Sequence, residues 1–164
     1  MDFEKSDKRA VKQQIVQFVR WAGESRIGRY VCWRIVDEMV GQTQNVVHDG
    51  LGLTFSIPNE LGRARADSFS TKEPETLAWI DAMPPKSVVW DIGANVGRYS
   101  CYAGKRRDCR VFAFEPSVFN LEMLARNIFL NGLTDRVTIV PLPLSGELSV
   151  SKLNMTAPTG AGPC

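Results

Sequence analysis

Short apolar segments alternate with amphipathic stretches after Pro85, and this alternation constrains the fold more than any other feature. The segments SVVWD (87–91), RVFAFE (110–115) and RVTIV (136–140) are expected to be buried strands. The stretches between them, up to about residues 106 and 131, have helical spacing of apolar residues. Strand, helix, strand, helix, strand at these lengths predicts right-handed βαβ units in a parallel sheet.

Two amphipathic helices and a β-hairpin are expected before the alternating region. Residues 9–22 and about 27–40 carry apolar side chains at helical spacing. Their apolar faces could bind a partner or a membrane surface, although such faces most often pack on their own domain. Within residues 45–58, two β-rich runs flank Asp49-Gly50, which is typical of a hairpin turn.

The stretch between the hairpin and the first buried strand predicts a single helix. The segment ELGRARADSFS (60–70) is interpreted as a polar connection. The following TKEPETLAWIDAM (71–83) predicts a helix with Ser70 or Thr71 near its N-cap and Pro74 in its first turn.

Composition excludes several classes of protein. The 164 residues are 44% hydrophobic and 23% charged, as in a folded domain, and the net charge of +2 gives no reason to expect nucleic-acid binding. No apolar run approaches the roughly 18–20 residues that span a bilayer, and the charged start lacks the apolar core of a signal peptide. We therefore expect a cytoplasmic protein without a membrane span. The scattered cysteines and the single His48 predict no metal site.

The turn after the first buried strand is the first candidate binding element. Ligands of open parallel sheets bind beyond the carboxyl ends of the strands. Here the chain reads D-I-G-A-N-V-G from Asp91 to Gly97. Gly93 permits a sharp turn, and Gly97 lets the next helix pack closely. The backbone amides at that helix start favour an anionic group such as a carboxylate, and Asp91 suits an ammonium group.

A second acid follows the next strand. Glu115 lies 24 positions after Asp91 (115 − 91) and could accept hydrogen bonds from both hydroxyls of a ribose. Together, the glycine loop and this acid predict a nucleoside-binding site. The structural alternative for both Asp91 and Glu115 is a strand-end acid that caps a neighbouring helix.

The loop also indicates which nucleoside is bound. A dinucleotide site requires G-x-G-x-x-G, whereas Asn95 stands between Gly93 and Gly97. This counts against an NAD-dependent oxidoreductase, the alternative enzyme class, and no phosphate-binding G-x-x-x-x-G-K-[ST] motif occurs. S-adenosylmethionine carries an ammonium and a carboxylate and has no phosphate.

Three runs of residues carry a family resemblance. KEPETLAWID, VVWDIGANVGRYS and VFAFEPSVFNLEMLARNIFLNG resemble the FkbM-type family of S-adenosylmethionine-dependent methyltransferases, across about residues 45–150. The resemblance implies a class I methyltransferase Rossmann-like fold. It also implies methylation of a hydroxyl on a sugar or small metabolite, so that the partner would be a small hydroxylated acceptor.

The resemblance further implies a set of cofactor-binding residues. The methionine part of the cofactor would be lined by Asp91, Gly93, Asn95 and Gly97, with Tyr99 and Ser100 behind them. Glu115 would hold the ribose. The adenine would be bordered by Pro116 and Ser117. Glu73 could approach the methionine ammonium, or be only an exposed acid in the first turn of its helix.

The sequence departs from the family pattern in two places. Where the family often has A-L-S-D, this chain reads PLSG (143–146), which removes an expected adenine contact. The family's later K-I-D-x-E-G motif is missing as well. We therefore expect residues 1–44 to be a helical extension and residues 45–164 to be the N-terminal part of a methyltransferase domain, incomplete after its third strand.

Such an incomplete chain would be inactive alone, and no residue stands out as the catalytic base. His48 is a weak candidate, because it lies in the expected hairpin. The alternative function is a non-catalytic nucleoside-binding or interaction module derived from a methyltransferase. Neither the methyl acceptor nor the oligomeric state follows from the sequence.

Overall fold

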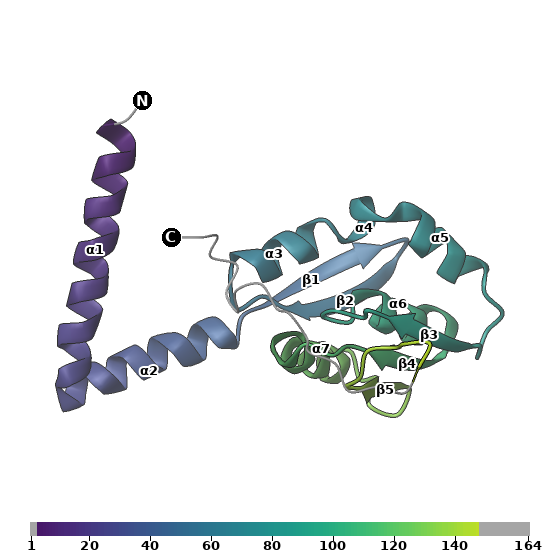
Figure 1. The fold of residues 1–164 in the computed structure, drawn as a ribbon. Coiled ribbons are helices and arrows are strands. Elements are labelled where there is room, and N and C mark those ends of the chain that lie inside the picture. The colour runs from purple at the N-terminus through teal and green to yellow at the C-terminus, as the bar shows by residue number, and fades with distance from the viewer. Residues whose placement is uncertain (1–2, 148–164) are drawn as a thin grey trace. The chain divides into compact units, whose positions relative to one another are not determined.

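The computed structural model describes residues 3–147, with side chains from residue 10, and the chain forms two compact units, Met1–Gly41 and Gln42–Cys164 (Figure 1). The first unit consists of helices α1 (Phe3–Glu24) and α2 (Arg26–Val40). Ser25 separates them, and its hydroxyl caps α2 by accepting a hydrogen bond from the Gly28 amide at 2.9 Å. Both predicted helices are therefore confirmed.

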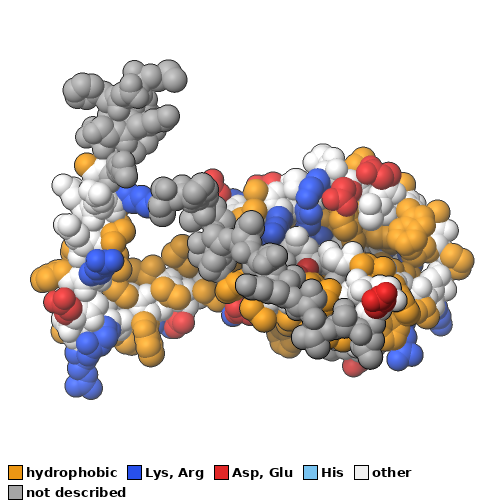
Figure 2. Space-filling model, in the orientation of Figure 1, with side chains coloured by type: hydrophobic (Ala, Val, Ile, Leu, Met, Phe, Trp, Pro, Cys, Tyr) orange, Lys and Arg blue, Asp and Glu red, His pale blue; other side chains and the backbone are white. Residues whose placement is uncertain are grey.

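The apolar side chains of these two helices are exposed. On α1 they include Ile15 and Phe18, and on α2 Ile27 and Trp33. Figure 2 shows hydrophobic side chains along this unit. Within residues 3–147, no helix combines the length and the apolar character needed to cross a membrane.

The predicted hairpin is confirmed in the second unit. Strands β1 (Thr43–His48) and β2 (Leu51–Ser56) pair antiparallel, with His48 opposite Leu51. The two turn residues both have left-handed backbone angles, φ 44° at Asp49 and 77° at Gly50. A two-residue turn of this kind matches the right-handed twist of the strands, which is why the Asp-Gly pair predicts it.

The interpretation of residues 60–70 as a polar connection was wrong. They form α3 (Glu60–Asp67) and the start of the short α4 (Phe69–Lys72). The Asn59 side chain caps α3 by accepting a hydrogen bond from the Gly62 amide at 2.9 Å. Few apolar residues mark this segment, but Ala66 and Phe69 are fully buried. Tertiary burial therefore stabilises helices that show little periodicity.

The following helix is confirmed, although its predicted N-cap was wrong. Helix α5 spans Pro74–Ala82 and begins after Glu73, without a side-chain cap. Ser70 and Thr71 lie inside α4 instead. Pro74 fits the first turn because that position needs no backbone donor.

The alternating region forms the predicted parallel sheet. Its strands are β3 (Val88–Ile92), β4 (Arg110–Phe114) and β5 (Val137–Val140), in the order β3-β4-β5, and both pairs are parallel. Helix α6 (Arg98–Arg107) connects the first two strands and α7 (Val118–Leu130) the last two. The predicted fold class is confirmed: an α/β unit with three parallel strands, the arrangement of the first part of a class I methyltransferase fold, preceded by helices and a hairpin.

The two faces of this sheet differ in burial. Val89, Val111 and Val137 lie in the hydrophobic core that the sheet shares with the hairpin and helices. On β3 the alternate residues Val88, Trp90 and Ile92 are each more than 60% exposed. Because a strand turns successive side chains to opposite faces, the described residues cover β3 on one side only.

Two asparagines, Asn127 in the last turn of α7 and Asn131 directly after it, join the hairpin to the region of the parallel sheet. The Asn131 side chain accepts a hydrogen bond from the Thr54 amide at 3.0 Å and donates one to the Thr54 carbonyl at 2.8 Å. Asn127 accepts a hydrogen bond from the Ser56 amide at 2.8 Å. These side chains satisfy backbone groups of β2 and fix the hairpin against α7.

Two glycines with the same backbone angle test how much of the fold depends on close packing. Gly50 and Gly97 have φ 77° and 78°, but an added Cβ meets nothing at Gly50 and would lie 2.3 Å from Leu124 Cδ1 at Gly97. We expect Gly50→Ala to cost about 1–2 kcal/mol of unfolding free energy from backbone strain alone. Gly97→Ala should cost about 2–5 kcal/mol, because overpacking adds to the strain. Urea unfolding measures both, and equal losses would contradict the packing role of Gly97.

Candidate functional site

The loop between β3 and α6 is held by hydrogen bonds to the adjacent strand. The amides of Gly93 and Ala94 both donate to the Phe114 carbonyl, at 2.9 and 3.0 Å, and the Gly97 amide donates to the Ala94 carbonyl at 2.8 Å. Gly93 and Asn95 adopt left-handed angles, φ 81° and 54°. Glycine and asparagine are the residues that tolerate such angles.

Glu115 lies beneath this loop. One carboxylate oxygen accepts a hydrogen bond from the Asn95 amide and the other from the Ser117 amide, both at 2.8 Å. The residue is only 6% exposed. Glu115 therefore ties together the turns that follow β3 and β4. A carboxylate has about four acceptor positions, so both oxygens keep capacity for a further donor.

Asp91, near the end of β3, is held by the next helix. The Ser100 hydroxyl donates a hydrogen bond to Asp91 Oδ2 at 2.5 Å. Burial raises the pKa of Asp91, the hydrogen bonds from Ser100 oppose that shift, and the nearby carboxylates of Glu115 and Glu73 add to it. The fold thus retains an acid whose ionised form it disfavours, which is a common feature of functional sites.

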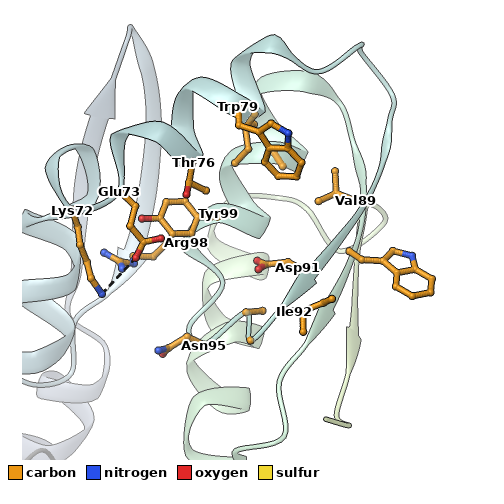
Figure 3. A pocket seen from close by; sticks show the side chains of 15 residues that line it. Lys72, Glu73, Thr76, Trp79, Val89, Asp91, Ile92, Asn95, Arg98 and Tyr99 are labelled. Atoms are coloured by element: carbon orange, nitrogen blue, oxygen red, sulfur yellow. Dashed lines mark ion pairs between the residues drawn. The ribbon is translucent and has the colours of Figure 1, made fainter. Parts of the chain in front are cut away.

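A cavity of about 270 Å³ opens beside Asp91 (Figure 3). Its volume lies near the lower end of small-molecule pockets, about 300–1,000 Å³. Five of the predicted site residues line it: Glu73, Asp91, Gly93, Asn95 and Tyr99. Figure 3 shows Glu73, Thr76 and Tyr99 together on one side of the cavity and Asp91 on β3 facing them.

The other predicted site residues lie around the cavity without lining it. Gly97 packs under Leu124, and Ser100 acts through its bond to Asp91. Glu115 lies below the loop, while Pro116 and Ser117 follow β4, half-buried.

Sequence reasoning missed several lining residues. Lys72, Thr76, Trp79 and Arg98 all border the cavity. Thr76 lies three positions after Glu73 and Trp79 three after Thr76, and side chains at this spacing are neighbours on a helix, which could have indicated them. Arg98 directly follows the glycine loop, but no motif singles it out.

Tyr99 lines the cavity beside Glu73. Its buried oxygen makes no well-aligned hydrogen bond among the described residues, although the Glu73 carboxylate lies next to it as an acceptor. Burial, and then the negative charge of Glu73, raise the pKa of Tyr99 to about 12. The hydroxyl therefore stays protonated at neutral pH and can donate a hydrogen bond.

Asn127 is a further residue that sequence reasoning missed. Its side-chain amide donates to the Val96 carbonyl in the loop at 2.8 Å, while its oxygen accepts from the Ser56 amide. The side chain is 1% exposed. One buried asparagine thus connects the hairpin, α7 and the loop beside the cavity.

His48 lies away from the cavity lining, in an aromatic cluster. Its ring packs edge-on against Phe69 and Tyr102. Potential metal-ligand atoms of His48, Asp49 and Asp81 lie within 4.8 Å of one another. Asp81 is already bound by Tyr102 Oη and Arg106 Nε, both at 2.8 Å. Burial raises the pKa of Asp81, but these hydrogen bonds lower it overall. The positive charge beside Asp81 is therefore already supplied by the Arg106 guanidinium.

Comparisons with known proteins find partial similarity to solved structures only. No family model matches the sequence, and no curated protein matches it. A structure of Pyrococcus horikoshii TYW2 in complex with MeSAdo is similar over 62% of this chain and 36% of that one, with 19% identity and a TM-score of 0.46. A Geobacter sulfurreducens SAM-dependent methyltransferase in complex with S-adenosyl-L-homocysteine is similar over 46% and 32%, with 24% identity and a TM-score of 0.41.

A third similar structure is the precorrin-6y C5,15-methyltransferase of Geobacter metallireducens. It has 27% identity over 43% of this chain and 37% of that one, with a TM-score of 0.39. The chain is thus a distant structural match to S-adenosylmethionine-dependent methyltransferases and spans about a third of the length of each of these three proteins.

The raised pKa of Asp91 predicts a stability change in Asp91→Asn. At neutral pH, far above the ordinary value of 3.8, folding of the wild type must either bury the charged carboxylate or bind a proton to it, whereas asparagine retains the Ser100 hydrogen bond without charge. We expect the variant to be more stable at neutral pH. The gain should shrink as pH falls through the raised folded pKa towards the ordinary value of 3.8, because the acid is then neutral in both states.

Thermal unfolding from pH 3 to pH 8 measures this effect. Asp135→Asn is the matched control, because Asp135 is exposed. A variant that is less stable than wild type at neutral pH would contradict the electrostatic account of Asp91.

Asn127→Leu should destabilise the fold strongly. The substitution leaves the buried Ser56 amide and Val96 carbonyl without this partner, at a cost of about 2–5 kcal/mol in total. Asn120→Leu on the same helix removes no side-chain hydrogen bond among the described residues and should stay within about 0.5 kcal/mol of wild type. Chemical unfolding compares the two variants, and similar losses would remove Asn127 as the connecting residue.

Proposed function

We propose that this protein is an S-adenosylmethionine-dependent methyltransferase of the FkbM type, which methylates a hydroxyl of a sugar or small metabolite. The observation that carries the proposal is the cavity at the end of β3, where Asp91 and Glu73 face Tyr99 beside the glycine loop. We further propose that residues 45–164 contribute the N-terminal part of the methyltransferase domain and that residues 1–44 are a helical extension to it.

The charges of the cavity suit the methionine end of this cofactor. An ammonium group beside Asp91 and Glu73 would compensate two carboxylates, one of which the protein buries at an energetic cost. The sulfonium adds a second positive charge. A nucleotide phosphate in the same place would be repelled by both acids, which favours this cofactor over NAD.

Glu115 and the residues after it complete the proposed cofactor site. The two oxygens of Glu115 each accept one backbone amide, and their remaining lone pairs could accept hydrogen bonds from ribose hydroxyls. Access requires the hydroxyls to approach past the loop, because the carboxylate is buried. Pro116 and Ser117 would then border the adenine.

Methyl transfer from this cofactor is an in-line displacement. When bound, S-adenosylmethionine would supply the methyl group: the acceptor oxygen would bond to the methyl carbon as the carbon–sulfur electron pair returned to sulfur, which would leave S-adenosylhomocysteine. The acceptor hydroxyl loses its proton to a base as it attacks. The protein's main contributions are alignment of donor and acceptor and exclusion of water. In this proposal Asp91 orients the cofactor, and Ser100 orients Asp91.

Calorimetric titration with S-adenosylmethionine and S-adenosylhomocysteine tests the proposal. We expect wild type to bind both ligands and Asp91→Asn to bind about tenfold or more weakly, because a charge-assisted hydrogen bond is lost. This loss would accompany a gain in stability, so misfolding could not explain it. Asp135→Asn is the control, and NADH is the ligand of the rival enzyme class.

Three further outcomes decide the reaction and the rival class. Release of S-adenosylhomocysteine from S-adenosylmethionine in the presence of hydroxylated acceptors would establish turnover. Cofactor binding without turnover on any acceptor would favour a non-catalytic nucleoside-binding module. Wild type that binds NADH but neither adenosyl ligand would refute the proposal.

A further inference from the structure

We infer that Arg98 binds the carboxylate of the cofactor's amino-acid group and thereby selects ligands that carry this carboxylate. The inference rests on the proposed function and adds a charged donor that the sequence motif does not contain. It follows from a buried arginine at the cavity that has no ion pair among the described residues, and from the positive charge of a second arginine near it.

Arg98 is an unusual residue to bury. It opens α6, lines the cavity and is only 9% exposed. Its Nη1 donates to the Arg65 carbonyl at 2.6 Å, and its guanidinium lies 5.6 Å from the centre of the Tyr99 ring. Within residues 10–147, no carboxylate oxygen lies within 4.0 Å of its nitrogens. A buried charge without a counter-ion is costly, so this position favours an anionic ligand.

A second arginine increases that preference. Burial lowers the pKa of Arg65, the positive charge of Arg98 lowers it further, and Glu115 partly compensates. The two guanidinium groups therefore repel each other in the absence of a ligand. An anion beside Arg98 would relieve both the missing counter-ion and this repulsion.

The loop offers few alternative donors for an anion. The amides of Gly93, Ala94, Asn95 and Gly97 are occupied by backbone carbonyls or by Glu115, which leaves the Val96 amide among residues 93–97. Lys72, another cation at the cavity, lies 3.8 Å from the Glu73 carboxylate. Arg98 is thus the charged donor left for a carboxylate among the described residues of the cavity, beside uncharged donors such as Thr76 and Asn95.

The geometry also matches an amino-acid group as a whole. The cavity combines the acids Asp91 and Glu73 with the base Arg98. In an α-amino acid, the ammonium and the carboxylate are attached to the same carbon atom, so a single ligand group can satisfy both kinds of charge. A lone phosphate would meet Arg98 but would also meet the two acids.

A pair of ligands that differ by one group tests the inference. S-adenosylmethionine and its decarboxylated analogue share the adenosine, the sulfonium and the ammonium, and only the first has the carboxylate. We expect wild type to prefer S-adenosylmethionine by about tenfold or more in calorimetric titration. Arg98→Met should lose about that factor for S-adenosylmethionine and stay within about twofold of wild type for the analogue.

Two control variants separate binding from folding. Arg63→Met removes an exposed arginine of α3 and should leave both affinities unchanged. Arg98→Lys keeps the charge and should restore part of the preference. If Arg98→Met does not fold, the wild-type preference and its reduction in Arg98→Lys still test the claim.

The outcomes distinguish this inference from the proposed function. Equal binding of both ligands by wild type, or an equal loss for both in Arg98→Met, would overturn the role of Arg98 while leaving the cofactor site in place. Wild type that binds neither ligand would refute the proposed function itself, and the inference with it.

Discussion

The buried carboxylate of Glu115 is the interaction on which the site depends. It accepts one amide from the turn after β3 and one from the turn after β4, so that a single side chain fixes both turns in register. Charge-assisted hydrogen bonds to backbone amides are stronger than neutral ones, and burial strengthens them further. The left-handed angles of Gly93, Asn95 and Gly97 persist in this setting. The cavity lies beside the loop that Glu115 holds.

Structural support and proposed ligand binding therefore overlap in this region. Glu115 has the role of a strand-end acid bonded to neighbouring turns, and it also retains acceptor capacity towards a ribose. Asp91 differs, because its burial opposes ionisation, and the Ser100 hydrogen bond stabilises its charged form only in part. Arg98 likewise has no ion pair among the described residues and donates to a backbone carbonyl. Two acids and this arginine at one cavity are the charges that the proposed zwitterionic group requires.

The sequence predicted the elements whose signals are local. Strands such as Val88–Ile92 read as short apolar runs, although this strand is buried on one face only among the described residues, and the Asp49-Gly50 turn follows from left-handed backbone preferences. The helices of residues 60–72 were missed because they are stabilised mainly by the burial of Ala66 and Phe69, which local periodicity does not reveal. The loop acids were found by spacing along the chain. Arg98 and Asn127 were not, because their importance arises from contacts with distant residues, Arg65 and Ser56.

The central claim is that the loop between β3 and α6 faces an adenosyl ligand, and ¹H–¹⁵N NMR during titration with S-adenosylhomocysteine tests it most directly. The account predicts shifts in the amides of residues 91–99 and in the indole of Trp79, which borders the cavity. The amides of Asp49 and Gly50 at the hairpin turn should stay unchanged, because no residue of that turn lines the cavity. Saturating ligand that shifts the hairpin turn but leaves residues 91–99 unmoved would contradict the account.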